Sequence, residues 1–439
     1  MILAGKDSSI PVSQDVEREL LPPATMAVKK RPLLLLLLWL ITTVLLFIFG
    51  PYSYSFGNKI QLYTYLAAVH IALYAGYCLG LRTKPQRPKV ILKGLALAKI
   101  SLLFSGVLLM VNLLCTGGGD IGRLALAIKD PGAAYAAGST KGGVSIFNYI
   151  GIFSAPVSMM SFVLGTYYWA RLRVVYKILL ASLFATAILS SIGASVRSTI
   201  IITGLYAAAA FGAAYQNKII HVTSRAKLML VVVLVCATVV FFKYFAFLTE
   251  NRQQGDNRLR NPLTNEMPAQ DHPMYKILPE AWHNTYTIAA FYISHSYYRL
   301  AQALNMPFIG IGWGASNSAF LVRNIVRLTG WTEFENYSYG MRLDRMTGYG
   351  DFGLAWSTIY TWIASDVTFP GSVLIIFMIG YFFARAWTGV LEQRGPLSVM
   401  AFACFVIIVF SFPMNNPLQD GPGISTYFGI PFLWWLNRG

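Results

Sequence analysis

Long apolar runs alternate with short polar loops along most of the chain. Seven runs lie at about 33–50, 60–81, 94–115, 145–170, 177–194, 198–215 and 228–248, and three more at about 369–390, 397–413 and 422–436. Most approach or exceed the roughly 18 residues that a helix needs to cross a bilayer. The pattern predicts an all-α polytopic integral membrane protein with about ten transmembrane helices, within a range of about ten to twelve.

The interval 249–368 departs from this pattern. A segment of roughly 120 residues between tightly connected spans is usually functional or a small domain. Two stretches inside it, 286–304 and 352–364, are apolar and rich in aromatic residues, which favour the membrane interface. We therefore expect interfacial or re-entrant helices there. The predicted organisation is a polar tail (1–32), transmembrane helices 1–7 (33–248), a large loop (249–368) and transmembrane helices 8–10 (369–439).

Composition and charge agree with a membrane protein and give its orientation. Only 12% of the residues are charged, against about 25% in soluble domains. The net charge of +17 is unevenly spread, because residues 250–366 hold nine basic and ten acidic side chains whereas 82–93 holds five basic and no acidic ones. An excess of Lys and Arg in short loops marks the cytoplasmic side. Both termini are thus expected in the cytoplasm and 249–368 on the outer side, with no nucleic acid as partner.

Four groups of residues are candidates for chemistry. Arg197 lies between two expected spans among small residues, and an ionisable group at the membrane boundary indicates function unless it only reaches lipid head groups. In a helix, His295 and Arg299 would share a face and could bind phosphate and relay a proton, or form a plain surface pair. The third group is a Gly-rich stretch, 308–318, expected to form a tight turn that packs Trp313 against the membrane face.

The fourth group is the stretch 341–357, "MRLDRMTGYGDFGLAWS". If it is helical, Arg342, Arg345 and Tyr349 align on one face, where guanidinium forks suit phosphate or carboxylate. Asp344 and Asp351 are candidate bases. The alternative is a solvated loop.

Other common site patterns are missing from the sequence. It has no HExxH motif, no paired Cys/His set, no carboxylate-dense metal set, no GxGxxG motif and no Walker A motif. The four cysteines all lie within or at the end of apolar runs, where they are expected to be packing residues. We therefore predict neither a metal nor a cofactor.

The order of short motifs resembles the Wzy-type oligosaccharide repeat-unit polymerases, or O-antigen polymerases. "SVRS" (195–198), "YIS" with following basic residues (292–299), "GIGWGA" (310–315) and "YGDFGLAWSTIY" (349–360) occur in that order before a span with an early glycine. The resemblance covers roughly 190–435, whereas the first half matches only in hydropathy.

The resemblance implies a membrane-embedded, metal-independent glycosyltransferase of the bacterial inner membrane with a large periplasmic loop. Its substrates would be undecaprenyl-pyrophosphate-linked glycans, polymerised at the periplasmic face into O-antigen or a related surface polysaccharide. Membrane lipids and a chain-length regulator protein would be its partners.

Roles for the candidate residues follow from this resemblance. Arg197, Arg299, Arg342, Arg345 and Tyr349 would bind pyrophosphate or glycan. The acceptor hydroxyl needs a base, for which the candidates are Asp351, His295 and Asp344. Two other functions stay open: an O-antigen ligase that uses a lipid A core as acceptor, or a lipid-linked oligosaccharide flippase.

Overall fold

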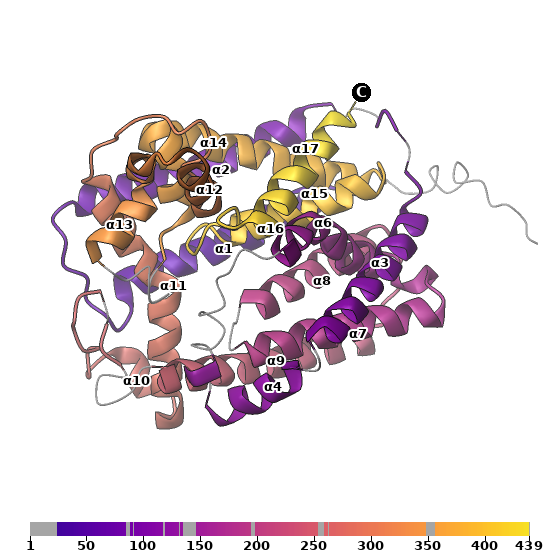
Figure 1. The fold of residues 1–439 in the computed structure, drawn as a ribbon, viewed down its shortest axis with the longest axis horizontal. Helices are drawn as coiled ribbons and strands as arrows, with labels where there is room; N and C mark the ends of the chain where they lie inside the picture. Colours follow the sequence, from indigo (N-terminus) through magenta and orange to yellow (C-terminus); the bar gives the residue numbers. More distant parts are fainter. Residues whose placement is uncertain are drawn as a thin grey trace, which may run out of the picture.

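The computed structural model describes residues 24–84, 88–90, 92–116, 119–130, 132–134, 146–194, 198–252, 259–261, 263–347 and 356–438. Within these ranges the chain is helical and has no strands, apart from one isolated bridge between Pro88 and Arg438. The class predicted from the sequence, an all-α polytopic membrane protein, is therefore confirmed at this coarse level. Figure 1 shows the helices packed in layers, with α11 crossing the direction of most others.

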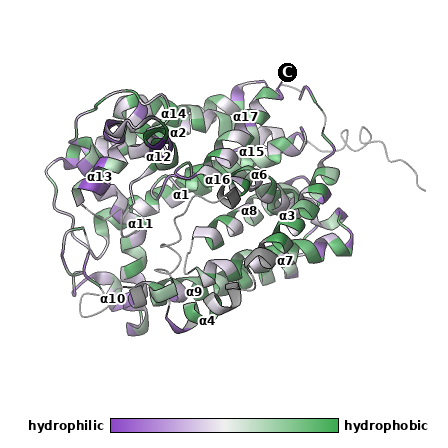
Figure 2. Cartoon of the chain, in the orientation of Figure 1, coloured by the Kyte–Doolittle hydropathy of each residue, from purple (hydrophilic) through white to green (hydrophobic). Residues whose placement is uncertain are grey.

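Eight helices in the described part of the chain are long and apolar enough to cross a membrane. They are α1 (Met26–Phe49), α2 (Lys59–Arg82), α3 (Gly94–Thr116), α6 (Ile146–Tyr167), α7 (Val174–Gly193), α8 (Ser198–Gln216), α9 (Ser224–Arg252) and α14 (Ile359–Leu391). The first seven match the seven spans expected before residue 249. Hydrophobic residues make up most of these helices, and hydrophilic residues are more frequent at the connections (Figure 2).

The remaining elements are shorter. They are α4 (Gly119–Lys129), η2 (Trp169–Arg171), α10 (Pro273–Ile277), η3 (Glu280–Trp282), α11 (His283–Leu304), α12 (Ala319–Thr329), η4 (Thr332–Tyr337), α13 (Tyr339–Thr347), α15 (Pro396–Phe410), α16 (Gly421–Gly423), η5 (Ile424–Phe428) and α17 (Gly429–Leu436). The expected span at 397–413 is the 15-residue helix α15, and that at 422–436 is divided among α16, η5 and α17. Length and composition thus support eight spans, and the expected count of about ten is not confirmed.

The eighth expected span begins at a kink. Helix α14 starts at Ile359, inside the expected large loop, and continues through Thr368, whose φ of 67° interrupts the helical geometry. Pro370 follows, and proline has no N–H to donate to the preceding turn, so it bends a helix. Two helices therefore meet at Thr368, at the predicted boundary 368–369, and α14 is the name given to both together.

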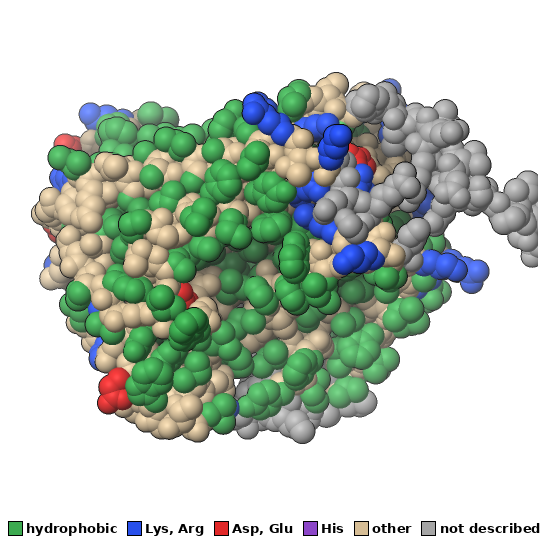
Figure 3. Space-filling view, turned by 90° about the horizontal axis from the view of Figure 1, so that it is seen from above, with side chains coloured by type: hydrophobic (Ala, Val, Ile, Leu, Met, Phe, Trp, Pro, Cys, Tyr) green, Lys and Arg blue, Asp and Glu red, His purple; other side chains and the backbone are tan. Residues whose placement is uncertain are grey.

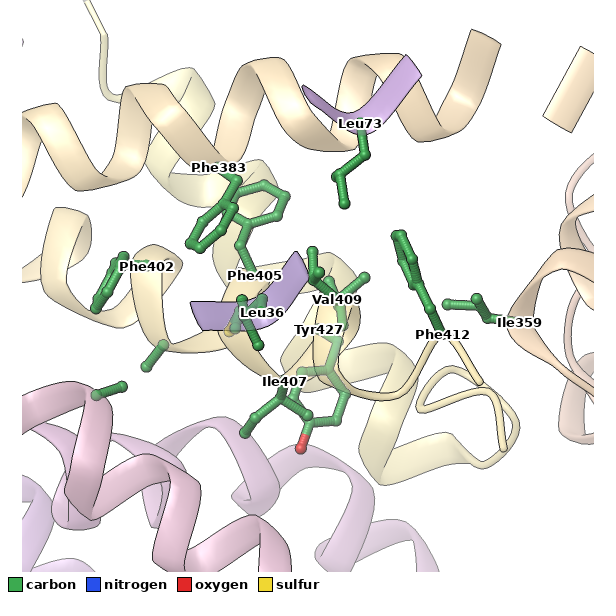
Figure 4. Close-up of a cluster of buried hydrophobic side chains, with 14 of the residues drawn as sticks. Leu36, Leu73, Ile359, Phe383, Phe402, Phe405, Ile407, Val409, Phe412 and Tyr427 are labelled. Carbon is green, nitrogen blue, oxygen red and sulfur yellow. The ribbon is translucent and has the colours of Figure 1, made fainter. Parts of the chain in front are cut away.

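Helices α2 and α14 pack backbone against backbone. A Cβ added to Gly76 would lie 2.0 Å from Phe377 O, and one on Gly380 would lie 2.3 Å from Leu73 O. Gly76 and Gly80 are four residues apart, the small-xxx-small spacing that lets membrane helices approach closely. Next to this contact, Phe383 of α14 meets Phe402 and Phe405 of α15 in the core (Figure 4).

The basic loops meet at one end of the molecule. Arg385 Nη1 donates to Thr83 O (2.6 Å) and Lys84 O (2.7 Å), and Asn217 Nδ2 donates to Val390 O (2.9 Å). The first turn of α1 joins them, since Tyr77 Oη donates to Lys29 O (2.8 Å). We call this end the basic face, comprising the described residues 26–31, 82–84, 88–90, 168–173, 217–223, 392–395 and 437–438. Lys and Arg side chains gather at one end in Figure 3, whereas apolar side chains cover much of the rest of that view.

The glycine contact between α2 and α14 makes a prediction for stability. Gly380→Ala places a methyl group against Leu73 O, and such overpacking costs about 1–3 kcal/mol, more than the roughly 1 kcal/mol that alanine contributes to a helix. We expect a lower melting temperature in detergent. Gly204→Ala in α8 is the matched control, because nothing lies within 4 Å of its added Cβ. Equal melting temperatures for the two variants would contradict the proposed contact.

Candidate functional site

A cavity of about 1410 Å³ lies among α6, α8, α9, α11, α12 and the segment 410–427. Most of its lining is apolar, including Phe162, Phe241, Phe242, Phe245, Ile407, Phe410 and Met414. The lining uses the early part of α6, the first turns of α8 and the late part of α9. Because α6 and α8 end at the basic face and α9 begins there, the cavity lies in the opposite half of the molecule.

Polar residues from α12 and the segment 415–420 line part of this cavity. Helix α12 is amphipathic: Ala319 and Val322 are buried, whereas Arg323 and Arg327, one turn apart, are exposed. Both arginines line the cavity. Phe320 N donates to Gln419 O (2.9 Å) and so ties the start of α12 to the second polar segment.

The two arginines differ in their contacts. Arg327 Nη2 donates to Asn324 Oδ1 (2.7 Å) and to Tyr149 Oη (3.0 Å). Arg323 makes no hydrogen bond or ion pair with another described residue. Arginine guanidinium groups present several donors in a fixed plane that suits phosphate oxygens. The pair is therefore suited to an anionic ligand group at the polar part of the cavity.

Asp420 places a carboxyl group on the same cavity. It caps the short helix α16, and its Oδ1 accepts a hydrogen bond from Gly423 N (2.7 Å). Although Asp420 is exposed at the surface, the protein atoms around its carboxyl group displace water and raise its pKa above the usual value, while the Gly423 N–H acts in the opposite direction. A carboxylate of raised pKa is a better proton acceptor than a fully hydrated one.

His295 lies behind the cavity wall and is fully buried. Its Nε2 accepts a hydrogen bond from the backbone N–H of Trp356 (3.2 Å), so Nδ1 carries the proton and donates to Phe291 O (3.0 Å). Trp356 itself lines the cavity. Burial, with a smaller contribution from the positive charge of Arg299, lowers the pKa of His295 to about 3. To act as a base through Nε2, this histidine would first have to break its hydrogen bond with the backbone N–H of Trp356.

Arg299 is one turn from His295 in α11, as the spacing predicts, and is also fully buried. Its Nη2 donates to Asp344 Oδ1 at 2.5 Å. Asp344, expected to act as a base, is therefore paired with Arg299, expected to bind phosphate. Neither residue is among the described residues that line the cavity. The pair fastens α13 to α11.

Arg342 and Arg345 of α13 each bind residues close to them in the fold, outside the lining of the large cavity. Arg342 Nη2 donates to Pro307 O (2.9 Å), and its guanidinium lies over the Tyr339 ring (4.7 Å). Burial lowers the pKa of Arg342. Arg345 binds Glu335 (2.6 Å) and Asn336 (2.9 Å). The two arginines lie within one helix, as expected, and Tyr349 follows the described part of α13.

Three candidates from the sequence lie outside the described residues: Arg197, Tyr349 and Asp351. The structure thus joins Arg299 to Asp344, keeps Arg342 and Arg345 on local partners and places His295 beneath the cavity wall.

In the segment 308–318, the Asp366 carboxylate accepts hydrogen bonds from Gly314 N (3.1 Å) and Asn317 N (2.9 Å). The resulting turn leaves Trp313 91% exposed.

Sequence reasoning missed Arg323, Arg327 and Asp420. A signal for the arginines was present in "AFLVRNIVRLT", where two basic residues four apart share the polar face of a short amphipathic helix. Asp420 follows "PLQ" in an ordinary polar turn, and nothing local marks it. Its place beside the arginines arises only from tertiary packing.

The comparisons with known proteins show no relative. No family model, no curated protein and no solved structure matches the chain.

The Arg299–Asp344 pair makes a second prediction. Asp344→Asn leaves the fully buried guanidinium with a neutral partner, and we expect it to lower the free energy of unfolding by about 2 kcal/mol. The matched control is Glu335→Gln, which removes the ion pair with the 53% exposed Arg345 and should cost at most about 1 kcal/mol. Chemical denaturation measures the free energy of unfolding of both variants. Equal losses would show that the buried pair contributes no more to stability than the exposed pair.

The burial of His295 makes a prediction for pH. The folded protein keeps this ring neutral down to about pH 3, whereas in the unfolded chain the ring takes up a proton below the ordinary histidine pKa of about 6.5. Its contribution to stability is therefore complete above about pH 6.5 and is lost as the pH falls towards about 3. We expect His295→Gln to lose less unfolding free energy than the wild type on acidification. Parallel pH profiles would contradict this assignment.

Proposed function

We propose that this protein is a glycosyltransferase that polymerises polyprenyl-pyrophosphate-linked oligosaccharide repeat units, as the resemblance to the Wzy-type polymerases implies. The observation that carries the proposal is the large cavity, mostly apolar in lining and bordered by Arg323, Arg327 and Asp420. A ligand with a long apolar tail and an anionic head matches such a lining. Ordinary small-molecule pockets have volumes of about 300–1,000 Å³, so this cavity suits a larger substrate.

In this proposal the two arginines hold the leaving group. The hydroxyl oxygen of the acceptor sugar attacks the anomeric carbon of the donor glycan, and the bond from that carbon to the pyrophosphate oxygen breaks. Polyprenyl pyrophosphate departs as an anion, and negative charge develops on its oxygen. Fixed positive charge at that point lowers the barrier, which is the role of Arg323 and Arg327.

Asp420 accepts the proton of the attacking hydroxyl. Its carboxyl lines the same cavity as the arginines, and its raised pKa suits proton transfer. Arg197 and Asp351 remain predictions for the same reaction. Helix α11 supports the wall of the site, because His295 holds Trp356 at the cavity surface.

The cellular setting is part of the proposal. With the basic face in the cytoplasm, as the distribution of Lys and Arg favours, the cavity faces the periplasmic half of a bacterial inner membrane. Lipid-linked glycans would enter from that leaflet, and a chain-length regulator would be the partner protein.

The proposal is tested with purified protein in liposomes that contain lipid-linked repeat units. Arg323→Ala should lower polymer formation about 100-fold, the usual effect of removing one group that stabilises developing charge. Asp420→Asn should lower it by at least about 100-fold, because it removes the general base. Lys276→Ala on α10, an exposed residue that does not line the cavity, is the control and should keep wild-type activity. Wild-type polymer formation in both cavity variants would overturn the proposal.

The phenotype of cells that lack the protein distinguishes polymerisation from the two other functions, ligation and flipping. Loss of a polymerase leaves single repeat units on the surface acceptor. Loss of a ligase leaves no glycan on that acceptor, and loss of a flippase accumulates lipid-linked units on the cytoplasmic side of the membrane. Either of the last two results would replace polymerisation as the function.

A further inference from the structure

A second, much smaller cavity lies at the basic face, at the opposite end of the molecule from the large one. Its volume is about 30 Å³, and three arginines line it: Arg385 from α14, Arg394 from the turn before α15 and Arg438 after α17. Ser398 and Trp434 are among the other residues that line it. We call this set the arginine pocket. The space admits one small polar group, since a single water needs about 10–15 Å³.

Arg385 is only 6% exposed and makes two of its hydrogen bonds to the connection that follows α2, at Thr83 O and Lys84 O. Its Nε is buried and has no hydrogen-bond partner among the described residues. A buried charged donor without an acceptor is costly, and most such groups in folded proteins are satisfied. Arg385 lines the pocket, so this N–H is the donor that a bound acceptor there has to reach.

The charged side chains among the described residues that line the pocket are all basic. No acidic side chain is among the described residues that line it, and Glu392 binds Arg394 Nε (2.6 Å) from outside this lining. Arg438 lies over the Trp434 ring at 3.5 Å. Burial and the neighbouring positive charge of Arg385 lower the pKa of Arg438 to about 9. The first turn of α15 adds the positive end of a 15-residue helix at the pocket wall.

We propose that Arg385, Arg394 and Arg438 form a binding site for a phosphate group. A tetrahedral oxyanion fits the small volume, supplies an acceptor for Arg385 Nε and neutralises like charges that the fold brings together. The site does not depend on the proposed glycosyl transfer, because it shares no residue with the large cavity.

The surroundings of the pocket match an anionic lipid head group. Helix α17 leads directly into Arg438 and exposes Phe432, Leu433, Trp435 and Leu436. Exposed apolar and aromatic side chains beside a cluster of arginines suit acyl chains next to a phosphodiester. Inorganic phosphate offers the same oxyanion without the chains, and the experiment below separates these two sources.

A bound phosphate would also join segments that are distant in the sequence. Arg385 reaches the connection after α2, and Pro88 pairs with Arg438 in the isolated bridge. Lys89 N donates to Asn437 O (2.7 Å) beside it. The ligand therefore contacts residues that hold α2, α14, α15 and α17 together at this face, and its binding should raise the melting temperature of the protein.

The test titrates detergent-purified full-length protein with three probes: inorganic phosphate, short-chain phosphatidylglycerol and short-chain phosphatidylcholine. We expect phosphatidylglycerol to raise the melting temperature and phosphatidylcholine to have little effect. Arg438→Gln should weaken the response to phosphatidylglycerol by at least about tenfold in half-saturating concentration. Arg173→Gln is the matched control, because Arg173 is exposed on the same face but does not line the pocket. It should respond as the wild type does.

Each outcome of these titrations either supports the phosphate site or rejects it. If inorganic phosphate stabilises the wild type as well as phosphatidylglycerol does, and Arg438→Gln loses both responses, the occupant is free phosphate and the site stands. If no probe stabilises the wild type, or if Arg438→Gln and Arg173→Gln respond alike, the site is rejected. Arg438 is partly exposed, so its variant tests the pocket even where a substitution of the buried Arg385 fails to fold.

Discussion

The close contact between α2 and α14 is the constraint on which the rest of the structure depends. A helix in a bilayer satisfies its own backbone hydrogen bonds, so neighbouring helices gain mainly from van der Waals contact, and glycine permits the closest approach. Gly76, Gly80 and Gly380 let two backbones meet there. Side chains of both helices, among them Leu73 and Phe383, belong to the main hydrophobic core.

The two ends of α14 organise two different regions. Before the kink, Asp366 holds the turn at 312–317, and Ser365 Oγ accepts a hydrogen bond from Tyr339 N (3.0 Å) at the start of α13. After the kink, the helix runs to the basic face and carries Arg385 to the connection that follows α2. Helix α14 thus holds the turn that leads into α12 and also lines the arginine pocket. The bend at Thr368 and Pro370 allows a single chain segment to do both.

The buried polar residues of α11 serve a supporting role in this arrangement. His295 and Arg299 share one face of the helix, but each is engaged by another segment: His295 by Trp356, and Arg299 by Asp344. Groups held in this way orient a wall, whereas Arg323, which has no partner among the described residues, is left available to a ligand. The contrast explains why the cavity gains its charge from α12 and not from α11.

The sequence by itself determined the helical membrane class and the first seven spans, because each apolar helix closes its hydrogen bonds within one short stretch. The spacing of four residues likewise predicted that His295 and Arg299 lie on one face of a helix, α11. Only the tertiary structure decided which polar groups meet. Asp344 pairs with Arg299 across 45 residues, and Asp420 joins the cavity of Arg323 from a distant turn. Such pairings depend on how whole helices pack, and the hydropathy of any single segment carries no information about them.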